Sequence, residues 1–142
     1  MFNTYSPWAE LTGLPHIRLE WVQLTGRRLG EYVRHLGLIR LDPRMPRRQA
    51  RSVLCHELRH VEYGDVGTTC TKAEAWQEKR ADTHAARLLI DVRDLADALV
   101  LHDHHQGAVA VELRVSAVML ATRLRHLHPA ETHYLRRRCH VE

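Results

Sequence analysis

The chain has 142 residues, of which 44% are hydrophobic and 27% are charged, and its formal net charge is +4. This length and balance predict one soluble globular unit that buries a core without disulfide bonds. The basic excess is small and spread along the chain, which argues against nucleic-acid binding as the main function. Three cysteines without regular spacing do not form a disulfide framework and favour a reducing environment.

The N-terminal residues contain no basic segment followed by an apolar one, so we expect no secretory signal. No apolar run approaches the roughly 20 residues that span a bilayer. These features predict a cytoplasmic protein without a membrane partner.

Three short segments in the first third of the chain have the composition of β-strands. Residues 17–22 alternate apolar and polar side chains, and residues 31–34 and 38–42 are two more short strand-like runs. Because they follow one another with short connections, we expect a three-stranded antiparallel meander.

The helical period begins after the turn at residues 42–46. An apolar face with spacings of four, four and three predicts a first helix that stops near Gly64, with the residues Ala50, Leu54, Leu58 and Val61 on that face.

Helices dominate the rest of the chain. A second helix is expected to begin near Thr71 as its cap and to run through Leu89, and Asp91 is expected to cap a third. After a polar interruption at residues 102–107, Ser116 is expected to cap another helix, and Pro129 to begin the last one. The predicted fold is α+β, with a domain at 1–92 and a helical extension at 93–142 packed on it as one compact unit.

The first helix contains the motif His56-Glu57-Leu58-Arg59-His60. Two histidines four apart project from one face of a helix and can share a metal ion, for which neutral imidazole nitrogens suit zinc. Glu57 points to one side, where it can take a proton from a metal-bound water as general base. The alternative is a histidine-rich surface helix without a metal, but a packed helix leaves these polar groups in need of partners.

A catalytic zinc needs a third protein ligand, and the second helix offers Glu78, 18 residues after His60. Asp82, one turn later, could accept the other ring N–H of a ligand histidine. Glu74, one turn earlier, is the rival ligand. Glu78 is preferred because it leaves an acid four residues further on, although Glu74 would leave Glu78 in that place.

Together these segments resemble the ImmA/IrrE-type metallopeptidases of bacteria, phages and mobile elements. The resemblance covers residues 35–92 and rests on the motif at 56–60 and on Glu78-Lys79-Arg80-Ala81-Asp82 with the leucine pair at 88–89. It implies a thermolysin-like zincin fold and a location in the cytoplasm of a bacterial host. It also implies that the enzyme acts on a protein substrate, a transcriptional repressor. Two positions depart from the pattern: His84 replaces the usual phenylalanine, and Ile90-Asp91 replaces Met-Pro.

Other polar residues near these segments have simpler interpretations than a site. The histidines at 102, 104 and 105 are expected in an exposed turn, and Cys55 in the core. Tyr63 could lie near the cleft, and Cys70 could reach the metal, but neither is assigned a role.

The sequence thus predicts a zinc endopeptidase with ligands His56, His60 and Glu78 and with Glu57 as base. A non-proteolytic zinc-containing module that binds a regulator is the first alternative. A DNA-binding regulator, using residues 116–135 as a helix-turn-helix-like unit, is the second alternative, and the mild charge argues against it.

Overall fold

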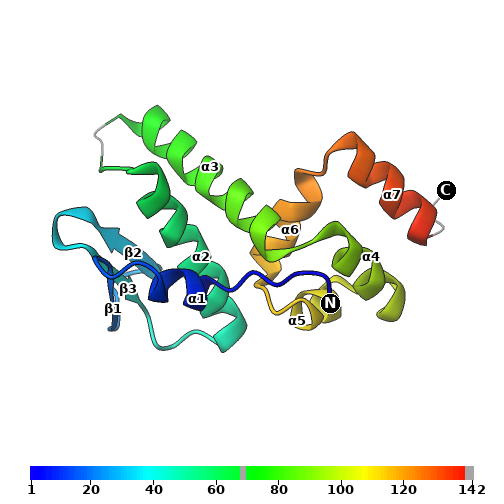
Figure 1. Ribbon diagram of the computed structural model, residues 1–142, viewed down its shortest axis with the longest axis horizontal. Helices are drawn as coiled ribbons and strands as arrows, with labels where there is room; N and C mark the ends of the chain where they lie inside the picture. Colours follow the sequence, from blue (N-terminus) through cyan, green and yellow to red (C-terminus); the bar gives the residue numbers. More distant parts are fainter. Residues whose placement is uncertain (68–69, 140–142) are drawn as a thin grey trace.

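The computed structural model describes residues 1–67 and 70–139. Its elements follow one another along the chain as α1 (Pro7–Thr12), β1 (Arg18–Trp21), β2 (Gly30–Val33), the short 3-10 helix η1 (Arg34–Leu36), β3 (Leu38–Leu41), α2 (Arg47–Tyr63), α3 (Thr71–Leu89), α4 (Val92–Leu101), α5 (Gln106–Glu112), α6 (Ala117–Arg125) and α7 (Pro129–Cys139). The expected α+β class is confirmed, with a small sheet at the N-terminal end and helices after it (Figure 1).

The sheet is mixed, so the expected antiparallel meander is wrong. The strand order is β1-β3-β2, with β1 parallel and β2 antiparallel to β3. The reason is burial: Leu38, Ile39 and Leu41 of β3 are all buried, whereas β1 is mostly exposed. A strand with that many apolar side chains takes the central position, where both of its edges are paired. The tight β2–β3 connection needs Gly37 at φ 57°, because a Cβ there would meet the His16 carbonyl oxygen at 2.6 Å.

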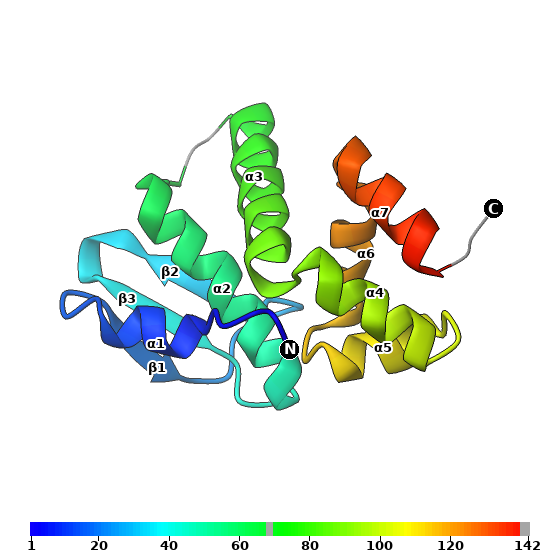
Figure 2. The same cartoon turned by 45° about the vertical axis from the view of Figure 1, so that its right-hand side comes forward.

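Helix α2 packs between the sheet and α3. Leu54 and Leu58 are fully buried against Ile39 and Leu41 of the sheet, whereas Cys55 belongs to the core formed with α3 and the later helices. In both views the sheet lies on one side of α2 and α3 on the other (Figures 1 and 2). The helix ends at Gly64, which adopts the left-handed conformation with φ 64°.

Helices α4 to α7 gather on the side of α3 away from the sheet (Figure 2). Their buried side chains form one core with α2 and α3, which includes Ala85, Leu95, Val109 and Leu120. The division at residue 92 remains a prediction, and the last three residues of the expected extension lie outside the described part. Helix α5 was not predicted, because its seven residues are too few to show a period.

Ser116 and Asp91 cap their helices as predicted, each accepting a hydrogen bond from a backbone N–H in the first turn. Thr71, the expected cap of the second helix, is instead the first residue of α3, and Cys70 holds the cap position. Along the residues that the structure describes, no helix is both long and apolar enough to cross a membrane.

Candidate metal centre

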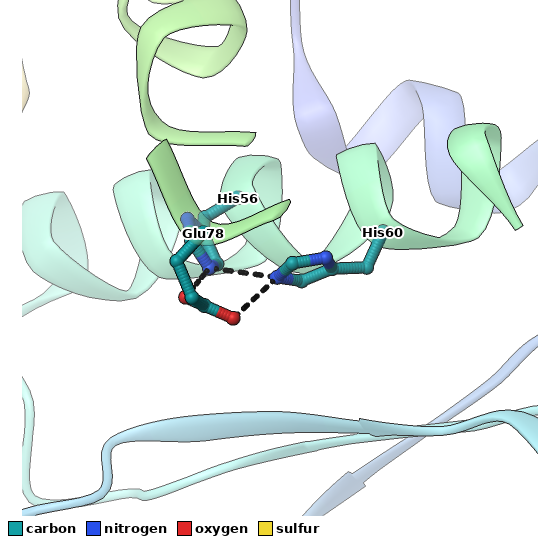
Figure 3. A group of neighbouring side chains, drawn as sticks. All are labelled: His56, His60 and Glu78. Atoms are coloured by element: carbon teal, nitrogen blue, oxygen red, sulfur yellow. Dashed lines mark hydrogen bonds and ion pairs between the residues drawn. The ribbon is translucent and has the colours of Figure 1, made fainter. Parts of the chain in front are cut away.

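The two motif histidines face each other from successive turns of α2. His56 Nε2 and His60 Nε2 are 3.1 Å apart, and both side chains are largely buried (Figure 3). The four-residue spacing produces this pairing, because residues one turn apart lie on the same face of a helix.

Glu78 of α3 completes the group. Its two carboxylate oxygens lie 3.0 Å from His56 Nε2 and 3.0 Å from His60 Nε2 (Figure 3). One donor atom from each of the three residues lies within 4.8 Å of the others, and no second group of this kind occurs among residues 1–67 and 70–139. Glu74, the rival in the sequence, lines the neighbouring cleft but does not belong to the group.

Each histidine uses its other ring nitrogen to contact an aspartate. His56 Nδ1 lies 2.7 Å from Asp82 Oδ1, and His60 Nδ1 lies 2.9 Å from Asp65 Oδ2. Asp82 was expected to contact a ligand histidine, but Asp65 was missed. It follows α2 directly after Gly64, and no helical period relates it to His60.

This arrangement fits a bound cation. With Nδ1–H donated to an aspartate, each neutral ring directs the lone pair of Nε2 at the same point as the Glu78 carboxylate. These three electron-rich atoms have no hydrogen between them, so they repel one another unless a positive charge lies at the point where they meet. A set of two imidazoles and one carboxylate is a donor set that catalytic zinc uses.

The pKa values of His56 and Glu78 also indicate that this group favours a positive charge. Burial lowers the pKa of His56, but hydrogen bonds to Asp82 and Glu78 outweigh it and raise the value to about 10. Hydrogen bonds from His56 and His60 hold the pKa of Glu78 well below its ordinary value. In the absence of a metal ion the group therefore retains protons, and a divalent cation would compete with them.

The family model of the IrrE N-terminal-like domain, a peptidase family (Peptidase M78), matches residues 16–125. The chain belongs to this family. The resemblance in the sequence is thus confirmed, and the match extends well beyond residues 35–92. No match was found among curated proteins or among solved structures.

In this IrrE N-terminal-like chain, Glu57 lies beside the histidine pair rather than in the donor group. It is buried, with 7% of its surface exposed, and burial raises the pKa of its carboxyl group. A carboxylate with a raised pKa is a stronger base than an exposed one, which suits a group that accepts and returns a proton.

A cleft of about 480 Å³ opens over these residues. Glu57, His60 and Glu78 line one side of it, and Gly30 to Tyr32 of strand β2 line another. In Figure 3 the strands pass opposite the three labelled side chains. The proposed metal group of this IrrE N-terminal-like chain thus faces the outer strand of the sheet across an open space.

The other polar residues singled out in the sequence lie outside the donor group. The Tyr63 hydroxyl contacts His84 Nδ1 at 2.5 Å, and both line a hollow beside α3 rather than the cleft. His105 caps α5 within an exposed turn, as expected. Cys55 is fully buried, and burial raises the pKa of its thiol to about 11. Cys70 is exposed at the start of α3.

Proposed function

We propose that this protein is a zinc-dependent metalloendopeptidase that acts on another protein inside the cell, with a transcriptional repressor of a phage or mobile element as the expected substrate. Membership of a peptidase family supports hydrolysis, and the donor set supports a metal. One observation carries the proposal: His56, His60 and Glu78 converge from two helices, and Glu57 lines the same cleft as His60 and Glu78.

The roles of the residues follow from their chemistry. The two imidazoles and the Glu78 carboxylate would hold the ion, which when bound supplies Lewis-acid activation of water and of a carbonyl group. Glu57 accepts a proton from the attacking water and delivers it to the departing amine. Its burial raises the pKa of its carboxyl group, which suits a group that takes up and returns a proton.

Strand β2 offers a place for the substrate chain. It is an edge strand of the sheet that the structure describes, paired with β3, and its residues Gly30, Glu31 and Tyr32 line the cleft. An extended peptide can add to such an edge through main-chain hydrogen bonds, which do not depend on its sequence. A peptide bound there would cross the cleft in front of Glu57 and His60.

Replacing the proposed base tests this function. Glu57→Gln keeps the size of the side chain but cannot accept the proton, so hydrolysis should fall by about 10²–10⁴-fold. Cleavage of casein, and of any repressor encoded beside the gene for this chain, would be followed by electrophoresis and mass spectrometry. Zinc content, measured by atomic emission, should stay at the wild-type level.

Glu62→Gln is the matched control, because Glu62 lies on the same helix and pairs with Arg59 outside the cleft. It should cleave at nearly the wild-type rate. If Glu57→Gln cleaves as fast as the wild type, Glu57 is not the base. If the wild type binds zinc but cleaves neither protein, the non-proteolytic regulatory module becomes the better hypothesis.

A further inference from the structure

Asp65 connects His60 to helix α3. Its side chain is 7% exposed, and its two oxygens contact different partners. Oδ2 lies 2.9 Å from His60 Nδ1, and Oδ1 accepts a hydrogen bond of 2.6 Å from Arg80 Nη2. The carboxylate therefore bridges a proposed ligand on α2 and an arginine on α3.

Arg80 is itself held between two aromatic rings. Its guanidinium carbon lies 3.8 Å from the ring centroid of Tyr63 and 4.3 Å from that of Trp76. Trp76 is one turn earlier on α3 and is 59% exposed, so burial does not explain its position. Stacking of the planar guanidinium against the two rings limits its movement, and its Nη2–H donates to Asp65.

Helix α3 thus orients the two histidines in different ways, one directly and the other through Asp65. His56 contacts Asp82, which belongs to α3. The partner of His60 belongs to the segment after α2, and Arg80 ties that partner to α3. One short stretch of α3, residues 76–82, would then supply the metal ligand Glu78 and orient both histidine rings.

We propose that Arg80 is a positioning residue that acts through Asp65, fixing the ring orientation and tautomer of His60 for metal binding. The inference rests on the proposed function, because it requires an ion at His56, His60 and Glu78. It goes further by assigning roles to Arg80 and Asp65.

A purely structural role and a purely electrostatic role for Arg80 predict different results. If the Arg80–Asp65 pair only fastens the end of α2 to α3, its loss lowers stability and leaves metal affinity unchanged. If the charge of Arg80 alone matters, removing a cation near the site strengthens the binding of another cation. Only positioning predicts that loss of the arginine weakens metal binding.

The test is zinc affinity of the full chain, measured by competition with a chromogenic chelator. Asp65→Ala should weaken zinc binding by about 10–100-fold, the usual effect of losing a partner of a ligand histidine. Arg80→Met keeps the stem between the two rings but loses the hydrogen bond, and should weaken binding by up to about 10-fold. The double variant should be no weaker than Asp65→Ala, because Arg80 acts through Asp65.

Arg87→Met is the matched control. Arg87 also lies on α3 and pairs with a carboxylate, Glu131, at 3.0 Å, but it does not contact the site. This variant should lose stability on heating and keep the wild-type zinc affinity. The visible absorption spectrum of the cobalt-loaded protein should change in Arg80→Met and stay the same in Arg87→Met, because the spectrum reports ligand geometry.

The outcomes separate the two proposals. If the wild type binds no stoichiometric zinc, the proposed function fails and the inference fails with it. If the wild type binds zinc and Arg80→Met binds it equally well or more tightly, the positioning role alone is overturned. The positioning role is also overturned if adding Arg80→Met to the Asp65→Ala variant weakens zinc binding by the same factor as adding it to the wild type.

Discussion

His56 and His60 each present one ring nitrogen to Glu78 and the other to an aspartate. A neutral imidazole has one donor and one acceptor nitrogen, so an acceptor at Nδ1 leaves Nε2 free to bind a cation. At the scale of single residues, the aspartates at Nδ1 therefore leave Nε2 of each histidine as the nitrogen that can bind a cation.

The choice between Glu78 and Glu74 can be tested at this scale. Glu78→Gln removes the charge from the oxygens that lie 3.0 Å from both histidines, so zinc affinity should fall by at least about 10-fold. Glu74→Gln, one turn earlier on the same helix, should bind zinc like the wild type. Isothermal titration with zinc measures both, and a greater loss in Glu74→Gln would reverse the assignment.

Residue spacing predicted only part of this site. The intervals between His56 and His60 and between Glu78 and Asp82 are helical, and helical intervals can be read directly from the sequence. Asp65 and Arg80 contact each other across the end of α2, and no interval relates them. Their pairing depends on how the helices cross, which the sequence does not state.

At the scale of elements, strand β2 approaches α2 closely at Gly30. A Cβ on Gly30 would lie 2.4 Å from Val53 Cγ1 and 3.5 Å from Glu57 Cγ. Val53 is β-branched and cannot turn away easily, so the strand and the helix would have to separate. The absence of a side chain at Gly30 thus sets the distance between the edge strand and the proposed base.

Gly30→Ala should therefore destabilise the fold by about 1–3 kcal/mol, the usual effect of overpacking. Urea unfolding followed by circular dichroism measures the free energy of unfolding. Gly13→Ala is the control, because a Cβ there meets only ordinary contacts at 3.4 Å or more. Equal stability of the two variants would show that the β2–α2 contact is not tight.

Strand order was the element-scale feature that local patterns did not predict. Residues 17–22, 31–34 and 38–42 contain the three strands, within one or two residues at each end. Their order in the sheet follows from which strand buries most apolar surface, and that depends on α2 covering β3. Local alternation shows which residues form a strand, but not which neighbour it pairs with.

At the scale of the whole molecule, Glu131 connects the last helix to α6 and to α3, the helix that carries Glu78. It accepts hydrogen bonds of 3.0 Å from Arg123 of α6 and 3.0 Å from Arg87 of α3. The hydrogen bond from Arg123 is the main cause that lowers the pKa of Glu131 from 4.5 to about 2, against the effect of burial.

This shift predicts a pH-dependent contribution to stability. A carboxyl group with a lowered pKa in the folded state stabilises the fold above pH 4.5, and the contribution disappears as the pH falls towards 2. Glu131→Gln should thus be less stable than the wild type by about 1–3 kcal/mol at pH 7, and the difference should shrink between pH 4.5 and 2. Thermal unfolding at a series of pH values measures it.

Glu112→Gln serves as the control, because this acid is exposed and its contact with His102 is a long one of 3.8 Å. It should stay within about 0.5 kcal/mol of the wild type at every pH. A Glu131→Gln difference that is constant with pH would contradict a role for the charge.

The proposed metal joins α2 to α3, so it should stabilise the whole fold. Saturating zinc, at about 100 times its Kd, should add about 2.7 kcal/mol to the free energy of unfolding. Chelation of the metal should lower the Tm measured by scanning calorimetry, and added zinc should restore it. His56→Ala should show no dependence on zinc, and a similar shift in that variant would place the ion elsewhere.

The sequence by itself determined the longer helices, the strand segments, the histidine pair and the motifs that indicate the family, because each depends on neighbours within a few residues. The three-dimensional structure decided the order of the strands, the junction of Glu78 with the histidines, and the contacts of Asp65 and Arg80. These features depend on how α2 packs against the sheet and against α3. Packing is set by the fit of buried surfaces from distant segments, and no local pattern in the chain records that fit.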